Sequence, residues 1–249
     1  MIMKKQLKTK MMALLGLAMS IPTLGQAQVA DTFYTKSKKE VVITPIKHGS
    51  MRIAYNGLEI QVDPVTVLPP ATDYSTFPKA DFILVTHEHF DHCDKNAVEQ
   101  LRKESTSVIT NANSAKLLGW GDVMKNGESK KLTGDIQLDA VPAYNQTEGR
   151  TQFHPKGRDN GFILTIDGLR IYIAGDTEDI PEMGAVKDID VAFLPTNQPY
   201  TMTPEQTAKA AKMFMPKVLF PYHYGETKIE RVVDLLKGSG IDVRIRNYQ

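Results

Sequence analysis

Six consecutive residues in the first half of the chain combine three imidazoles with two carboxylates, a set of side chains that can bind metal ions. Residues 87–92 read His-Glu-His-Phe-Asp-His and directly follow the short apolar run 83–85, which predicts a buried strand. Alternate residues at a strand end share a face, so His87 and His89 can point the same way. Asp91 and His92 can then face a second point nearby. Neutral imidazoles and carboxylates are ligands of Zn²⁺ and similar divalent ions.

Neither a solvated polar loop nor a helical zinc site accounts for this cluster as well. A solvated loop is disfavoured because a buried strand rarely ends in such a cluster without a metal or catalytic reason. A helical zinc site of the His-Glu-x-x-His type is excluded, since the residue four positions after His87 is Asp91. The cluster therefore predicts a metal site at the end of a strand.

The same arrangement, an apolar run that ends at a potential ligand, recurs along the chain. It occurs before His48, Asp176 and His223, and the remaining histidine, His154, lies in a long polar loop between Ala143 and Asn160. Loops of that length inside a compact domain are usually functional. If these strand ends lie at one edge of a pair of sheets, the side chains converge on one site.

Apolar runs and turn residues predict the elements that carry these side chains. Asn56-Gly57 and Asp167-Gly168 each separate two apolar runs and predict β-hairpins. Thr203-Pro204-Glu205-Gln206 has the cap, proline and glutamine of a helix start. Further strands are expected at 41–47, 108–110, 136–142, 191–195, 218–222 and 243–245, and further helices at 95–104, 114–118 and 228–236.

The chain starts with a segment typical of exported proteins. Four lysines precede an apolar run over residues 11–24, and small residues follow up to Ala27. This pattern predicts a signal peptide over residues 1–27 that is cleaved after Ala27, because the run is too short to span a bilayer. An uncleaved anchor is the alternative. We expect a periplasmic or secreted protein with no stable membrane anchor, a flexible lead-in over residues 28–40, and one domain over residues 41–249.

Composition and charge exclude some classes of protein. The 249 residues are 41% hydrophobic and 24% charged, which is ordinary for a soluble globular protein. Removal of residues 1–27 takes away four lysines and no acid, so the mature chain is mildly acidic and no nucleic-acid partner is expected. The single cysteine, Cys93, excludes an internal disulfide. It is interpreted as a small buried residue, with a ligand or a redox thiol as the alternative.

Three motifs together resemble the metallo-β-lactamase-fold hydrolase superfamily: residues 86–92 (Thr-His-Glu-His-Phe-Asp-His), 174–177 (Ala-Gly-Asp-Thr) and 221–224 (Pro-Tyr-His-Tyr). Residues 62–64, 197–202 and 48–50 are similar to its ascorbate-phosphate lactonase-like branch. The resemblance implies an α/β fold, a four-layer αββα sandwich, with a two-metal site at one edge. In that site His87 and His89 hold the first ion, Asp91, His92 and His223 hold the second, and Asp176 bridges both.

One departure from the family pattern concerns the first ion. The superfamily usually has a further histidine just after the strand that ends here at Pro142, where this chain has Tyr144-Asn145. Either His154 from the same loop replaces it, which we favour, or the first site lacks a ligand. The expected cofactor is Zn²⁺, as one or two ions. A weaker first site would favour a single ion, or Mn, Ni or Fe.

Several residues near these motifs are candidates for substrate binding. His48 is expected to line the pocket, and Lys156, with Arg158, either grips an anionic group or is a solvated loop residue. Asn145 and Tyr200 either donate to a developing oxyanion or hydrogen bond within the loops. A small-molecule substrate, anionic if these cations serve it, is therefore expected.

The leading functional hypothesis is an exported metal-dependent hydrolase of an ester, a lactone or a phosphodiester, with Asp91 and Asp176 as catalytic carboxylates. The resemblance alone leaves two alternatives. One is a metal-binding protein without hydrolytic turnover, and the other is an iron-dependent oxygenase on the same fold, with Cys93 as a candidate redox group. Function inferred from a fold is an analogy and is decided by the site.

Overall fold

Two seven-stranded sheets form the centre of the computed structural model, which describes residues 29–248. The first sheet contains, in spatial order, β1 (Asp31–Tyr34), β2 (Glu40–Lys47), β3 (Ser50–Tyr55), β4 (Leu58–Val62), β5 (Phe82–Val85), β6 (Ser107–Thr110) and β7 (Asp122–Val123). The second contains β14 (Asp242–Val243), β13 (Val218–Tyr222), β12 (Val191–Pro195), β11 (Leu169–Ile173), β10 (Asp159–Ile166), β9 (Ile136–Ala143) and β8 (Ser129–Lys131). The predicted signal peptide lies outside the described residues.

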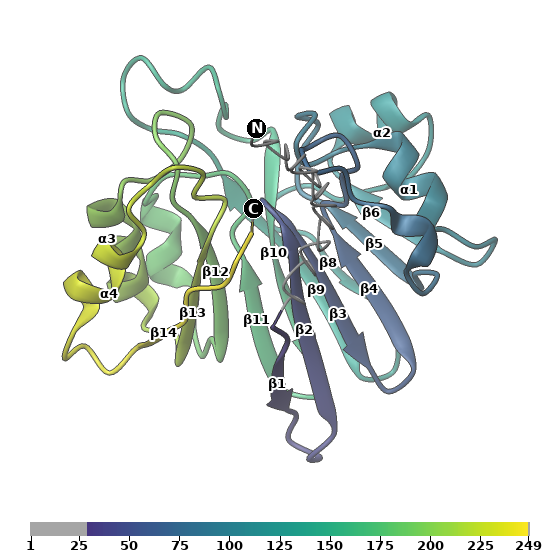
Figure 1. Ribbon diagram of the computed structural model, residues 1–249, viewed down its shortest axis with the longest axis horizontal. Helices are drawn as coiled ribbons and strands as arrows, with labels where there is room; N and C mark the ends of the chain where they lie inside the picture. Colours follow the sequence, from purple (N-terminus) through teal and green to yellow (C-terminus); the bar gives the residue numbers. More distant parts are fainter. Residues whose placement is uncertain (1–28, 249) are drawn as a thin grey trace, which may run out of the picture.

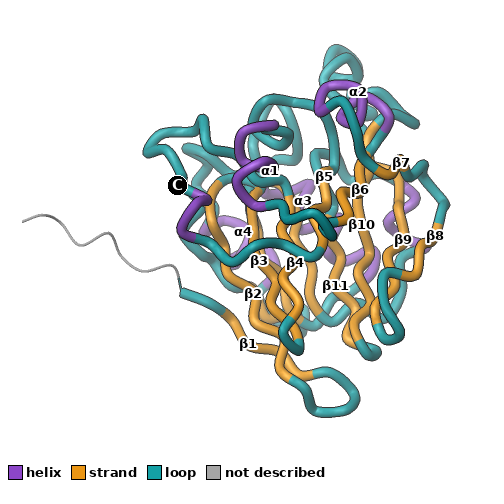
Figure 2. Tube along the Cα trace, turned by 90° about the vertical axis from the view of Figure 1, so that its right-hand side faces the viewer, coloured by secondary structure: helices purple, strands orange, loops and turns teal. Residues whose placement is uncertain are grey.

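Helices cover the outer face of each sheet, and the two sheets face one another (Figure 1). Helices α1 (Lys95–Leu101) and α2 (Ala112–Leu118) lie outside the first sheet, also seen from the side in Figure 2, and α3 (Pro204–Phe214) and α4 (Glu230–Leu236) outside the second. Two short 3₁₀ helices are η1 (Tyr74–Thr76) and η2 (Pro181–Ala185). The predicted four-layer αββα sandwich is confirmed. None of the described helices has the length and apolar character needed to cross a membrane.

Each sheet is antiparallel in one half and parallel in the other. Strands β1–β4 and β8–β11 pair antiparallel with their neighbours, whereas β4–β7 and β11–β14 pair parallel. Parallel neighbours need crossover connections, and the helices between successive strands provide them on the outer faces. One continuous cluster of buried side chains includes Ile53 and Ile60 of the first sheet and Leu138 and Leu164 of the second.

The two predicted hairpins form as expected. Asn56 and Gly57 both have positive φ (48° and 79°) in the two-residue turn that joins β3 to β4. Asp167 and Gly168 repeat this geometry (43° and 79°) between β10 and β11. Positive φ at both positions matches the twist of the flanking strands, and asparagine, aspartate and glycine tolerate it best.

The predicted flexible lead-in over residues 28–40 is wrong. Residues 31–34 form β1, which pairs antiparallel with β2, and β2 itself begins at Glu40. The carboxylate of Asp31 is buried and accepts hydrogen bonds from Arg244 Nη1 at 2.9 Å and Arg246 Nε at 2.8 Å. This ion pair joins the start of the domain to its end, so the domain begins before residue 41.

Candidate metal centre

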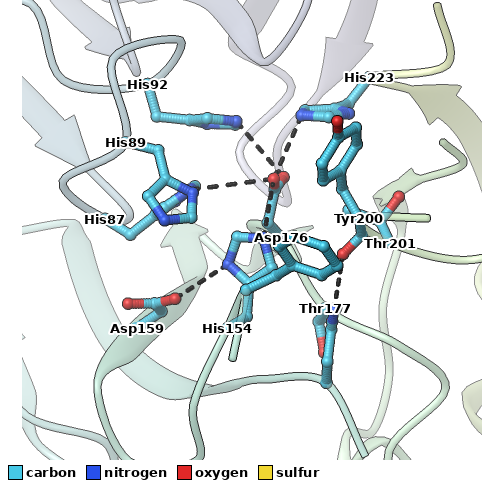
Figure 3. Close-up of polar contacts among 12 residues, drawn as sticks. His87, His89, His92, His154, Asp159, Asp176, Thr177, Tyr200, Thr201 and His223 are labelled. Carbon is cyan, nitrogen blue, oxygen red and sulfur yellow. Dashed lines mark hydrogen bonds and ion pairs between the residues drawn. The ribbon is translucent and has the colours of Figure 1, made fainter. Parts of the chain in front are cut away.

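Strand ends bring the predicted ligands together at one edge of the sandwich. The end of β5 leads to His87 and His89, the end of β11 to Asp176, and the end of β13 to His223. These strands belong to both sheets, so the site lies where the two sheets meet. Figure 3 shows five histidine rings arranged around the carboxylate of Asp176.

The carboxylate of Asp176 lies within reach of four histidine rings. Its Oδ2 atom lies 3.2 Å from Nε2 of His223, 3.5 Å from that of His154 and 3.9 Å from that of His87, and its Oδ1 atom lies 3.4 Å from Nε2 of His92. The side chain is almost fully buried. Asp176 therefore has the position of a group shared between two sets of ligands.

The first set consists of His87, His89 and His154, whose ligand atoms lie within 4.8 Å of one another. The long loop brings His154 there, because the backbone amide of Asn145 donates to the carbonyl of His154 at 2.8 Å and folds the loop back on itself. His154 thus lies beside the strand end where the family resemblance leaves no histidine. The structure brings it to the other two rings, and its ligand role stays a prediction.

The second set consists of Asp91, His92, His223 and His48, again with ligand atoms within 4.8 Å of one another. His48 Nε2 lies 3.0 Å from Oδ2 of Asp91, and the His48 and His223 rings have centroids 3.7 Å apart. The backbone amide of His223 donates to the carbonyl of His48 at 3.2 Å. His48 therefore contacts the predicted ligands directly, which is closer than the pocket-lining position expected from the sequence.

Buried acceptors fix the orientation of three of these rings. Asp63 Oδ2 accepts from His92 Nδ1 at 2.8 Å, and Asp159 Oδ2 accepts from His154 Nδ1 at 3.0 Å. Thr86 Oγ1 contacts His87 Nδ1 at 2.9 Å and itself donates to Asp63 at 2.7 Å. Each ring thus keeps its proton on Nδ1 and presents Nε2 to the centre, as ligand histidines usually do.

The sequence reasoning missed Asp63 and Asp159 as functional residues. Both lie at the edge of a strand, Asp63 directly after β4 and Asp159 at the start of β10. The one available signal was that a carboxylate at a strand end can support a ligand histidine on a neighbouring strand.

The charges of the centre are strongly coupled. Burial raises the pKa of Asp176, but the nearby His223 and His92 rings outweigh this and hold it well below its usual value. Burial lowers the pKa of His223, but Asp176 and Asp91 raise it overall to about 9. Burial lowers the pKa of His87 well below its usual value, which keeps that ring neutral. The carboxylates therefore demand positive charge, which protons on His92 and His223 or bound cations can supply.

Buried polar atoms without hydrogen-bond partners indicate that the centre suits metal ions. His87 Nε2, His92 Nε2 and Asp176 Oδ1 are all buried and make no hydrogen bond. Unpaired buried polar atoms are costly in a protein interior. Imidazole nitrogens and carboxylate oxygens that converge in this way fit a divalent ion such as Zn²⁺.

A cavity of about 370 Å³ opens onto the centre, and the predicted substrate-binding residues divide over it. Tyr200 lines it, together with Asp91 and Asp176. Asn145 does not, because its amide nitrogen donates to the carbonyl of Tyr200 at 2.7 Å and to that of Arg150 at 3.3 Å. The prediction that Asn145 contacts the substrate therefore gains no support from its position.

Lys156 also lies outside this cavity, so its position gives no support to the predicted contact with substrate. Its ammonium donates to Glu182 at 2.8 Å and to the hydroxyl of Tyr144 at 3.1 Å. Arg158 donates through Nε to Asp159 at 2.6 Å, and that Nε lies 3.2 Å from Glu88. Both cations thus stabilise the loop rather than face the cavity.

Cys93 packs in a smaller apolar cluster beneath α1. Burial raises the pKa of its thiol to about 12, so it stays protonated at neutral pH. This matches the interpretation of Cys93 as a small buried residue and gives no support to a reactive thiol.

Comparison with known proteins agrees with this fold and site. A model described as a β-lactamase superfamily domain matches residues 42–223. The UPF0173 metal-dependent hydrolase of Archaeoglobus fulgidus is 31% identical over 218 residues, which cover 82% of this chain and 94% of that protein. The chain therefore belongs to the metallo-β-lactamase superfamily of metal-dependent hydrolases, and the resemblance inferred from the sequence is confirmed.

Two crystal structures are similar to the chain over most of its length. That of a candidate metal-dependent hydrolase from Parabacteroides distasonis has a TM-score of 0.87 and 59% identity, and covers 89% of this chain and 100% of that one. Igni18, a metallo hydrolase from Ignicoccus hospitalis, has a TM-score of 0.69 and 26% identity, over 82% of this chain and 94% of that one.

Proposed function

We propose that the protein hydrolyses a carboxylic ester or a lactone at a centre of two divalent ions. His87, His89 and His154 would hold one ion, and Asp91, His92 and His223 the other. The observation that carries this proposal is the position of Asp176, whose two oxygens lie 3.2–3.9 Å from ring nitrogens of both sets. An anionic group between two cations offsets their mutual repulsion.

When bound, such ions lower the pKa of a water molecule toward neutrality and polarise the oxygen of a carbonyl group. The side chains of the protein supply position and proton transfer. Asp91 faces the cavity, and the contact with His48 at 3.0 Å fixes its orientation. Burial raises the pKa of Asp91, but hydrogen bonds from His223 and His48 hold it below its usual value, so it is ionised at neutral pH. An ionised carboxylate at this place can orient water or accept its proton.

Zinc is the metal we propose. Most of the seven predicted ligands are imidazoles and the others are carboxylates, and thiolates are absent from the described part of the set. This mixture suits Zn²⁺ and is also acceptable to Mn²⁺, Fe²⁺ and Ni²⁺. Elemental analysis of protein purified from its native host without chelator would identify the metal, and iron in place of zinc would contradict the choice.

The charge of the cavity favours esters and lactones over phosphodiesters. A phosphodiester keeps a negative charge, and the described residues that line the cavity include two carboxylates but no lysine or arginine. Lys156 and Arg158, the cations nearest in sequence to His154, are paired with Glu182 and with Asp159 and Glu88. An uncharged substrate therefore meets fewer unfavourable contacts in this cavity.

The experiment that tests the function compares metal-free and zinc-loaded protein on three probes: ethyl acetate, γ-butyrolactone and bis(4-nitrophenyl) phosphate. We expect zinc to restore hydrolysis of the ester or the lactone, and His223→Ala to abolish it while the protein stays folded by circular dichroism. Stoichiometric zinc without turnover of any probe would instead indicate a metal-binding protein. Turnover of the phosphodiester alone would refute the ester assignment.

We also propose that the protein is exported and that residues 1–27 are removed. The basic and apolar pattern of this segment supports the proposal. N-terminal sequencing of the protein from its native host should find Gln28 as the first residue. A chain that begins at Met1 or Ile2 would contradict export by this route.

A further inference from the structure

The cavity beside the metal centre has two chemically different sides. One side is formed by predicted ligands, among them Asp91, Asp176 and His223. The other is formed largely by three aromatic side chains, Phe90, Phe153 and Tyr200 (Tyr200 is labelled in Figure 3). The proposed function accounts for the first side and gives no role to the second.

The aromatic side chains are unusually exposed for their size. The side chain of Phe90 is 70% exposed, more than any other large apolar residue in the described part of the chain, and that of Tyr200 is 46% exposed. Exposed apolar surface that gathers at one place usually marks a binding site, and rings contribute most to such contacts. Because Phe90 stands between His89 and Asp91, and Phe153 precedes His154, the rings are adjacent to the predicted ligands.

Hydrogen bonds hold the Tyr200 wall in place before any ligand binds. The backbone amide of Tyr200 donates to the carbonyl of Asn197 at 3.1 Å, and the carbonyl of Tyr200 accepts from Asn145 Nδ2 at 2.7 Å. The Phe153 and Tyr200 rings meet edge to face with centroids 5.1 Å apart. A ligand that packs on this wall loses little entropy in ordering it. Asn145, expected from the sequence to touch the substrate, is thus a positioning residue for the wall.

We infer that the substrate carries an uncharged aromatic ring, or a flat apolar group of similar size, which packs on Phe90, Phe153 and Tyr200 beside the bond that is hydrolysed. The inference rests on the proposed function and specifies its substrate class. The cavity volume of about 370 Å³ is near the lower end for ligand pockets, which favours a single ring over a long acyl chain. In the reaction the acyl–oxygen bond breaks, the oxygen of water joins the acyl carbon, and the alcohol leaves with a proton.

The test compares the zinc-loaded protein on three ethyl esters: ethyl phenylacetate, ethyl acetate and the singly charged monoethyl succinate. The measured quantity is the ratio of kcat/KM for each ester to that for ethyl acetate, followed by proton release. We expect a ratio of about ten or more for the phenylacetate, since burial of a ring contributes roughly this much, and no preference for the charged ester. A ratio near one, or a preference for monoethyl succinate, would overturn the inference.

Variants connect the preference to the rings. Phe90→Ala and Tyr200→Ala should each lower the phenylacetate ratio about three- to tenfold, whereas Leu117→Ala, which removes a half-exposed leucine on α2, should leave it unchanged. Thermal unfolding checks that each variant is folded, and Phe90→Leu offers a milder change at the same place. An unchanged ratio in both ring variants would refute the assignment of the wall.

A binding measurement separates this inference from the proposed hydrolysis. If no ester is hydrolysed, the proposed function fails, but the wall can still be tested with 2-phenylacetamide and acetamide by titration calorimetry. Tighter binding of 2-phenylacetamide to wild type than to Phe90→Ala would support the aromatic site independently of turnover. Equal binding of the two amides would refute it.

Discussion

Asp63 is the residue whose change tests the metal centre most specifically, because it contacts a predicted ligand without being one. It is fully buried, and its Oδ2 atom accepts from His92 Nδ1 at 2.8 Å and from the hydroxyl of Thr86 at 2.7 Å. Its Oδ1 atom accepts from the backbone amide of Thr86 at 2.7 Å. Asparagine has the same shape and also tolerates the positive φ of 41° at this position, so Asp63→Asn changes chemistry more than packing.

The expected defect follows from the hydrogen bonds of the amide. If the amide oxygen keeps the backbone contact with Thr86, its NH₂ group faces His92 Nδ1 and can only donate to it. His92 must then carry its proton on Nε2, the nitrogen 3.4 Å from Asp176 that would bind the second ion. Loss of such a supporting partner typically lowers metal affinity about 10–100-fold, or about 1.4–2.7 kcal/mol of binding free energy.

Titration calorimetry with Zn²⁺ on chelator-treated protein measures this change. We expect Asp63→Asn to weaken one binding event by this factor and to spare the other, with an unchanged circular dichroism spectrum. The matched control is Asp179→Asn, because Asp179 is also a buried carboxylate but accepts its hydrogen bonds from Gln206 and Lys209. Wild-type affinity for both ions in a folded Asp63→Asn protein would refute the reasoning.

Three further changes have defined outcomes. Asp159→Asn should weaken the other zinc event about 10–100-fold because Asp159 supports His154, and a loss at both events in the same titration would contradict two separate sets. Gly49→Ala should weaken the zinc event that Asp63→Asn affects, since a Cβ there would lie 2.6 Å from Cε1 of His92; calorimetry with unchanged affinity would show that the ring can shift freely. Tyr74→Phe should flatten the loss of stability above pH 10. Burial raises the pKa of Tyr74 to about 12, so the unfolded chain ionises first and wild type loses about 2–3 kcal/mol of its unfolding free energy between pH 10 and 12, whereas equal slopes in urea unfolding of both proteins would contradict this.

Much of the fold could be predicted because its signals are local. The turns at Asn56-Gly57 and Asp167-Gly168 fix two hairpins through backbone geometry that few other residues adopt. The start of α3 is equally local, since Thr203 accepts from the amide of Gln206, whose side chain caps Thr203 in return. Such features depend on residues that are close in sequence, and the structure has them where they were expected.

Strand β1 could not be predicted, because what holds it lies far away in the chain. Its carboxylate at Asp31 is paired with Arg244 and Arg246, more than 200 residues later. A polar segment with few apolar residues gives no periodic pattern of its own, so pairing with β2 and this ion pair decide its structure. Only the folded chain brings these parts together.

The site shows the same division. The histidines were recognisable from residue type and strand ends, but the carboxylates that orient them were not, since an isolated aspartate such as Asp159 resembles any surface acid. Lys156 was expected at the substrate because its loop carries His154, yet its partner Glu182 belongs to η2 and turns it away. Sequence identifies reactive residues better than it identifies their partners.

The most direct test of the metal centre is the number of metal ions per chain, measured by elemental analysis on wild type and His154→Ala purified without chelator. Two ions in wild type and one in the variant are expected, because His154 would complete the first set with His87 and His89. Thermal unfolding should show that the variant remains folded. Equal metal content in the two proteins would contradict the role of His154, and one ion or none in wild type would contradict the two-ion centre itself.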